Sequence, residues 1–487
     1  MNKPLRRISL FCGLLVLALL IRTNWLQYVQ AEDLSTRKEN RRVQIAQYAT
    51  ERGNIIVGGQ PVTGSAVTDG SDFKFKRTYI DGPLWAPVTG YASQAFGSTQ
   101  LEKIDDGILT GNDDRLFFDR TIGMFTGEKK QGGNVITTLN ADAQKAAFSS
   151  LGDKKGAVAA IDPRTGAILA LASTPSYDPS TFAGNSKNDE KAWRTLNDSA
   201  DKNLVNRALR ETYPPGSTFK VVTTAAALEH NVVSDINLPT DTPEPYILPG
   251  TKTPMVNHAT GCEKATLNYA LQVSCNSVFA HIGDKVGRDG MVETAQKFGF
   301  NSTIDTPVRA FASVYDKTMG KDGNALSSIG QFNTAATPLQ MAMVTAAIAN
   351  DGKLMKPYMV EQLTAPNLDT IEKHEPQEMS RPLSAANAQK VQQMMVNVVE
   401  NGTGTSAKIK NVKVGGKTGT AQHGEKNAKR PYAWFISYAE LPDGSSPVAV
   451  AVVIEDSAVQ DREDITGGGL AAPVAKAVME AVLKNKG

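Results

Sequence analysis

Hydrophobic and polar positions divide this 487-residue chain into three zones. An uncharged apolar run occupies residues 8–21. About 100 residues follow in which short alternating stretches such as NIIV and FKFKRTYI are separated by Gly and Asp turn signals. Long apolar runs begin at Val135. The pattern predicts an N-terminal segment over 1–29, a small and mostly extended module over 30–134, and a larger domain over 135–487.

The larger domain has two strand-like runs early, three late, and helical patterns between them. GAVAAI and AILALAS flank DPRTG and predict a hairpin. Asn140 predicts the cap of a helix over 141–151, and a second helix follows Pro338 and ends at Asn350. The late strands are predicted around VKVGGKTGTAQ, YAWFISYAE and PVAVAVVIED. This order predicts an α+β domain built on one mainly antiparallel sheet.

The N-terminal segment has the composition of a membrane helix. Three basic residues precede the apolar run, which would rise about 21 Å as a helix, and Trp25 to Val29 extend it. One interpretation is a signal peptide cleaved near Ala31. However, Arg22 ends the apolar run early and leaves a long stretch before that site, which favours an uncleaved anchor. Either interpretation places the bulk of the protein outside the cytoplasm, and the uncleaved anchor predicts a single-pass protein of the cell membrane.

Charge and histidine content exclude several functions. The net charge of +2 gives no electrostatic reason to expect nucleic acid as a partner. None of the five histidines pairs at a metal-ligand spacing. The sequence therefore predicts neither a metal site nor a cofactor.

The cysteines leave two alternatives open. Cys12 lies inside the apolar run, whereas Cys262 and Cys275 lie in the exported region, where oxidation is permitted. They form either a disulfide or two buried free thiols.

The stretch ETYPPGSTFKVV carries the first candidate chemistry. Pro-Pro-Gly is a rigid, non-helical lead into an apolar helical run, so Ser217 is predicted at a helix N-terminus with Lys220 one turn later on the same face. The pair is either an activated nucleophile or an N-cap serine beside a solvated lysine. The same Ser-x-x-Lys spacing occurs three more times, so spacing alone does not decide.

The order of three motifs distinguishes between these two interpretations. Ser217-x-x-Lys220 is followed by Ser274-Cys275-Asn276 in a predicted helix-linking loop, and then by Lys417-Thr418-Gly419 on a predicted edge strand. This set resembles the signature of penicillin-binding proteins and serine β-lactamases. Together with YPPGSTFK, GGKTGTAQ, TPLQMA and WFISYAE, it most resembles the class B, monofunctional penicillin-binding transpeptidases. Arg52-Gly53-Asn54-Ile55 resembles an element of that family's N-terminal module, although Val57-Gly58-Gly59 departs from its usual continuation.

The chemistry assigns a role to each residue. Ser217 would be the nucleophile, Lys220 the general base once its pKa is depressed, and Ser274 the proton relay between Lys220 and Lys417. Substrate binding is predicted for Asn276, Lys417, Thr418, Gly419 and Thr420. Gly416 and Gly419 are expected to let substrate backbone lie against the strand. The resemblance implies an oxyanion hole formed by the backbone N–H groups of Ser217 and Thr420. Gly330-Gln331 resembles a family loop near the site, with a structural turn as the alternative.

The resemblance implies peptidoglycan D,D-transpeptidation. Its partners would be peptidoglycan stem peptides, β-lactams, the membrane, a membrane glycan polymerase and other wall-synthesis proteins. One alternative keeps the site but uses water, as in a D,D-carboxypeptidase or β-lactamase. Another is a non-catalytic scaffold or β-lactam sensor.

Overall fold

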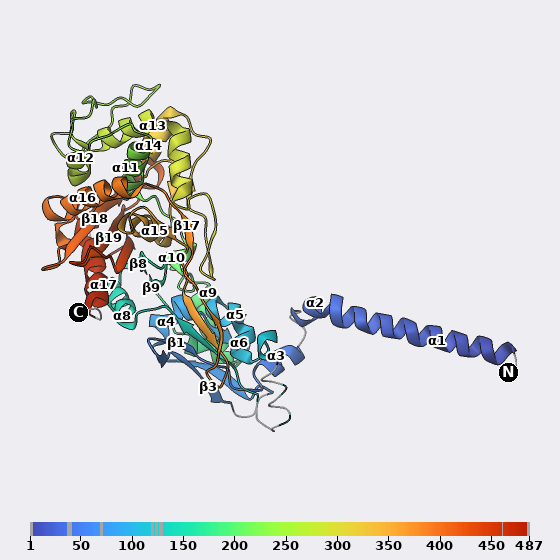
Figure 1. Ribbon diagram of the computed structural model, residues 1–487. Helices are drawn as coiled ribbons and strands as arrows, with labels where there is room; N and C mark the ends of the chain where they lie inside the picture. Colours follow the sequence, from blue (N-terminus) through green and yellow to red (C-terminus); the bar gives the residue numbers. More distant parts are fainter. Residues whose placement is uncertain are drawn as a thin grey trace.

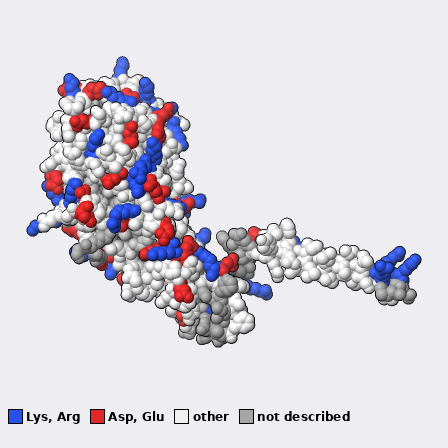
Figure 2. Space-filling view, in the orientation of Figure 1, with Lys and Arg blue, Asp and Glu red and all other residues white. Residues whose placement is uncertain are grey.

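The computed structural model describes residues 3–36, 41–68, 72–117, 121, 125, 130–459 and 461–484. Figure 1 shows a long helix projecting from a two-part body. That helix, α1 (Lys3–Asn24), continues into a π-helical turn (Trp25–Val29). Together they form a 27-residue segment in which an 18-residue window has a mean hydropathy of 2.0, long and apolar enough to cross a membrane. Figure 2 shows its uncharged surface, with Lys and Arg gathered at the free end.

A five-stranded sheet lies at the centre of the N-terminal module, in the order β16-β15-β7-β1-β2. Its members come from three separate parts of the chain: β1 (Ile55–Val57), β2 (Gln60–Pro61), β7 (Asn134–Thr137), β15 (Val360–Thr364) and β16 (Thr370–Lys373). Strand β7 is parallel to β1 and antiparallel to β15. The chain therefore returns from the larger domain to complete this sheet, as the orange strands among the blue ones show (Figure 1).

The module is less extended than its sequence predicts. A hairpin of β3 (Thr63–Val67) and β4 (Phe75–Tyr79) is present where alternating residues predicted strands. Short helices accompany it: α3 (Arg41–Gln47), α4 (Gly82–Thr89), α5 (Gln100–Ile104) and α6 (Asp106–Thr110). These helices are five to eight residues long and α4 contains two prolines, so they carry no long amphipathic repeat that a sequence pattern could reveal.

The larger domain contains the predicted antiparallel sheet, in the order β18-β19-β20-β8-β9. Its strands are β8 (Lys155–Ile161), β9 (Ile168–Thr174), β18 (Lys413–Ala421), β19 (Tyr432–Glu440) and β20 (Val448–Asp456). Alternate residues of β8 enter two different apolar clusters: Val158 packs with α8 (Ala141–Leu151) and α17 (Ala472–Lys484), whereas Ala159 packs with α15 (Pro338–Ala349). The sheet is thus covered on both faces, and β18 is an edge strand.

Five further helices form a subdomain beside β18. They are α11 (Lys220–Glu229), α12 (Leu267–Val273), α13 (Asn276–Lys297), α14 (Lys321–Ser327) and α16 (Ala385–Asn401). Helix α11 is buried along nearly its whole length, which makes it a rigid support for whatever its first turn carries.

Candidate active site

Ser217 lies in a tight turn at the start of α11. The first turn is a 3₁₀ helix (Gly216–Phe219) that leads directly into α11. Gly216 has φ 54°, and its N–H donates to the carbonyl of Gly330 over 3.0 Å. A Cβ on Gly330 would lie 2.1 Å from the Gly216 carbonyl oxygen, so this loop packs directly against the turn. Ser217 itself is partly exposed.

Ser274 lies between two helices with a left-handed backbone. It ends α12 at φ 69° and ψ 44°, and the next N–H, that of Cys275, donates to the Ala270 carbonyl over 2.8 Å. This turn aims the Ser274 hydroxyl at two lysines. Lys220 Nζ donates to Ser274 Oγ over 3.1 Å, and Lys417 Nζ donates to the same oxygen over 3.0 Å. The hydroxyl therefore bridges the first and third sequence motifs.

Lys220 makes further contacts with Ser274 and with residues that follow it in the sequence. Its Nζ donates to the Ser274 carbonyl over 2.8 Å and to Asn276 Oδ1 over 2.7 Å. Its Nζ also lies 5.6 Å from the centre of the Phe279 ring.

Burial, reinforced by the nearby charge of Lys417, lowers the pKa of Lys220 well below its usual value. Burial lowers the pKa of Lys417 to about 7. Lowering the pKa of a lysine increases the fraction of its neutral amine, the form that can accept a proton.

Strand β18 presents the remaining motif at the edge of the sheet. Lys417 Nζ also donates to the Thr418 carbonyl over 3.0 Å, while Thr418 Oγ1 lies 2.6 Å from Thr403 Oγ1. Thr420 is exposed, in keeping with a residue that meets a ligand.

The two glycines expected to accommodate substrate also pack closely against other parts of the protein. A Cβ on Gly416 would lie 2.6 Å from Cζ of Phe435, inside the core. A Cβ on Gly419 would lie 2.9 Å from the carbonyl oxygen of Pro215 and 3.0 Å from Cγ2 of Thr218. The small residue at Gly419 therefore lets the Ser217 turn approach β18.

Comparison with known proteins decides the family. The family described as penicillin binding protein transpeptidase domain matches residues 156–480, and the penicillin binding protein A dimerisation domain matches residues 52–135. The peptidoglycan D,D-transpeptidase PbpA of Mycobacterium tuberculosis is 40% identical, with 100% of both chains covered. This chain belongs to the penicillin-binding transpeptidase family. It is a D,D-transpeptidase of class B.

Solved structures agree with this assignment. The ceftriaxone acyl-enzyme complex of penicillin-binding protein A from M. tuberculosis matches with a TM-score of 0.85 at 40% identity, covering 90% of this chain and 100% of that one. The D,D-transpeptidase domain of an Eggerthella lenta peptidoglycan glycosyltransferase matches with a TM-score of 0.75 at 32% identity, covering 90% and 99%. The predicted transpeptidase fold is confirmed. With the apolar segment Lys3–Val29, the chain is a membrane-anchored member of the family.

The transpeptidase brings the predicted site residues into one region. Side chains of Lys220, Ser274, Asn276 and Lys417 form one hydrogen-bonded network. Ser217 occupies the turn beside it, and Thr418, Gly419 and Thr420 lie on the same strand as Lys417. Among the described residues, no group of three or more His, Cys, Asp or Glu side chains is placed to hold a metal.

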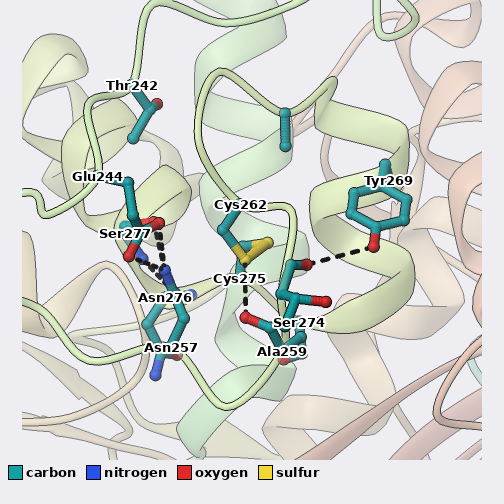
Figure 3. The surroundings of a disulfide bond; sticks show 12 residues. Thr242, Glu244, Asn257, Ala259, Cys262, Tyr269, Ser274, Cys275, Asn276 and Ser277 are labelled. Carbon is teal, nitrogen blue, oxygen red and sulfur yellow. Dashed lines mark hydrogen bonds between the residues drawn. A yellow bond between two sulfur atoms is a disulfide. The ribbon is translucent and has the colours of Figure 1, made fainter.

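Cys262 and Cys275 form a disulfide next to Ser274, with their Cα atoms 5.7 Å apart (Figure 3). The bond ties the loop before α12 to the residue that separates Ser274 from Asn276. Cys12 is a free, exposed cysteine on α1.

The sequence analysis gave no role to three supporting residues, although one of them, Trp434, begins its WFISYAE motif. Trp434 on β19 donates from Nε1 to the Pro214 carbonyl over 3.0 Å and so fixes the approach to Ser217. Thr403 reaches Thr418 from a loop after α16. Asn257 contacts the start of α13 from an irregular loop. Only tertiary structure brings these residues to the site.

Proposed function

We propose that Ser217 is the nucleophile of the D,D-transpeptidase, with Lys220 as general base and Ser274 as proton relay. The observation that carries this proposal is the position of Ser274 Oγ within 3.1 Å of Lys220 Nζ and 3.0 Å of Lys417 Nζ. Two buried lysines converging on one hydroxyl beside a helix-start serine provide a base and a route for its proton.

The reaction would proceed in two acyl transfers. Lys220 takes the proton of Ser217 as its oxygen attacks the carbonyl carbon of the D-Ala–D-Ala bond in a peptidoglycan stem peptide. The tetrahedral intermediate collapses, the C–N bond breaks, and the proton reaches the leaving D-alanine nitrogen through Ser274. The amine of a neighbouring stem peptide then attacks the ester. It gives its proton to Lys220 or the relay, and Ser217 recovers its proton as the crosslinked amide leaves.

The edge of β18 would bind the donor peptide. Lys417, Thr418 and Thr420 hold its terminal carboxylate, and Gly419 keeps the strand close to the nucleophile turn. Asn276 faces the substrate amide. Backbone N–H groups of Ser217 and Thr420 would form the oxyanion hole, where one donor is worth about 3 kcal/mol.

β-Lactams would acylate the same serine. The related M. tuberculosis protein carries ceftriaxone and imipenem as acyl-enzymes. A ring-opened β-lactam keeps its leaving group tethered, so the acceptor amine cannot replace it and the adduct persists.

The location follows from α1 and the disulfide. Lys3, Arg6 and Arg7 precede the apolar segment and favour a cytoplasmic N-terminus, with a single span and the catalytic domain outside. The Cys262–Cys275 disulfide supports an oxidising, extracytoplasmic setting. Glycan strands would come from a membrane glycan polymerase, accompanied by other wall-synthesis proteins, because the module over 30–134 is too small for a glycosyltransferase of its own.

Labelling with fluorescent penicillin tests this function. The label is expected on Ser217 by peptide mapping, to be absent in Ser217→Ala, and to be retained for many minutes. Release within seconds would instead indicate a carboxypeptidase or β-lactamase. A labelled peptide elsewhere in the chain would overturn the assignment of the nucleophile. Full complementation of a gene deletion by Ser217→Ala would favour the scaffold or sensor role.

A further inference from the structure

The N-terminus of α13 is capped by a residue outside the helix. Helix α13 begins at Asn276, and Cys275, which precedes it, makes no side-chain cap. The first N–H groups of a helix lack partners within the helix. Asn257, 19 residues earlier, supplies the acceptor: its Oδ1 accepts from the N–H of Asn276 over 2.7 Å and from that of Ser277 over 3.0 Å.

Glu244 fixes the orientation of the Asn257 amide. Nδ2 of Asn257 donates to both oxygens of Glu244, over 3.0 and 2.8 Å, and to Ser277 Oγ over 2.8 Å. Figure 3 shows Asn257 lying beside Glu244 and Ser277. With the amide nitrogen facing a carboxylate and the oxygen facing two N–H donors, only one orientation satisfies all partners.

The same loop also holds the Asn276 side chain. Asn276 Nδ2 donates to the carbonyl of Val256, the residue before Asn257, over 2.8 Å. This bond directs Asn276 Oδ1 toward Lys220 Nζ, 2.7 Å away. Neighbouring loop residues thus fix both the backbone and the side chain of a residue that contacts the general base.

We propose that Asn257 and Glu244 are positioning residues for the Ser274–Asn276 segment, and through it for Lys220. The inference rests on the proposed roles of Lys220 and Asn276. The loop is tied to this segment twice, covalently by Cys262–Cys275 and noncovalently by Asn257. The covalent tie limits how far the segment can move, and the noncovalent tie sets the direction of its side chains.

The test compares acylation by fluorescent penicillin in the full-length protein in detergent. Asn257→Ala is expected to lower the second-order acylation rate about tenfold or more, because small displacements of catalytic groups are costly. It is also expected to move the acid limb of the pH profile to lower pH, since Asn276 Oδ1 favours the charged form of Lys220. Glu244→Ala is expected to act in the same direction, and Glu244→Gln to restore most of the rate, because its amide oxygen still accepts from Asn257.

Asn237→Ala is the matched control. Asn237 is exposed in the same region and accepts from Asn268 over 3.0 Å, away from Asn276. The Asn237→Ala variant is expected to be acylated at the rate of the unmodified protein.

If Asn257→Ala and Glu244→Ala are acylated at the unmodified rate with an unchanged pH profile, the proposal is wrong and Asn257 is a structural cap only. If Asn257→Ala does not fold, the Glu244 variants decide alone. A label mapped away from Ser217 in the unmodified protein would instead refute the proposed function.

Discussion

Lys220, from the first sequence motif, and Lys417, from the third, both direct their amino groups at one atom, Ser274 Oγ. Neither lysine is solvent-exposed. Two ammonium groups this close and this far from water would repel each other, so the arrangement favours deprotonation of at least one of them. The catalytic proposal and the pH behaviour of the enzyme both depend on this pair.

Lys417→Met is expected to move the acid limb of penicillin acylation to higher pH. In the proposed mechanism, acylation requires Lys220 without its proton, and the charge of Lys417 is one of the two causes that lower the pKa of Lys220. At neutral pH we expect the rate to fall by roughly 100-fold or more, because the variant also lacks a charged contact for the substrate. Acylation rates measured from pH 5 to 10 give both effects. Lys413→Met is the control, since Lys413 is on the same strand but pairs with Glu440 at the surface. An acid limb that stays in place would contradict the coupling between the two lysines.

The same substitution is expected to stabilise the fold. The pKa of Lys417 is about 7 in the folded protein against 10.5 as its usual value, so between these values the unfolded chain binds the extra proton and stability rises with pH. The cost of burying Lys417 is therefore full below about pH 7 and disappears toward pH 10.5. Lys417→Met should raise the free energy of unfolding by about 1–3 kcal/mol at pH 6, after its lost hydrogen bonds are counted. Thermal unfolding at pH 6 and pH 10 measures this, and a gain that does not shrink with pH would refute the argument.

The sequence predicted which motif residues gather at the candidate site better than it predicted the residues that support them. Ser217, Lys220, Ser274 and Lys417 lie in short motifs whose order is informative, and helix 141–151 carries its own cap at Asn140, which accepts from the Ala143 N–H as predicted. Such signals are local. The side chains that hold these residues act across the chain, so no pattern in their neighbourhood marks them.

The N-terminal sheet shows the same limit for the backbone. Strands β15 and β16 join it from residues 360–373, far from β1 and β7 in the sequence. Val360–Thr364 has the composition of a strand, but pairing is chosen by tertiary contacts that propensity does not contain. The boundary predicted near residue 135 divides the chain only by position in the sequence. Residues 360–373, which come much later, complete the sheet of the smaller module.

Trp434→Phe is expected to loosen the turn that carries Ser217. The indole Nε1 donates to the Pro214 carbonyl, and the ring meets Tyr213 edge-on with centroids 6.1 Å apart. Phenylalanine keeps much of the packing but loses the donor, so we expect a loss of about 1 kcal/mol in stability and a several-fold slower acylation. Trp193→Phe is the control: Trp193 stacks on Phe96 at 4.6 Å and its buried Nε1 has no hydrogen-bond partner, so no bond is lost. Equal acylation rates in the two variants would contradict the role of Trp434.

Glu102→Gln is expected to destabilise the N-terminal module strongly. Glu102 is fully buried between two guanidinium groups, with Arg52 at 3.0 Å and Arg77 at 2.6 Å. A glutamine of the same shape removes the negative charge and turns an amide nitrogen toward one of the arginines. Removing one partner of a buried ion pair costs about 3–5 kcal/mol because the opposite charge stays buried without compensation. Asp106 also pairs with Arg52, so the cost should lie toward the lower end of that range.

Chemical unfolding of the full chain measures this cost, with Glu51→Gln as the control because Glu51 is exposed beside Arg52. Ser217 lies in the other domain, so the folded variant should still be labelled by fluorescent penicillin at an unchanged rate. A Glu102→Gln protein as stable as the Glu51→Gln control would mean that Arg52 and Arg77 are satisfied without the carboxylate. In that case, their other acceptors, among them Asp106 for Arg52 and Thr63 and the Gly64 carbonyl for Arg77, would have to suffice.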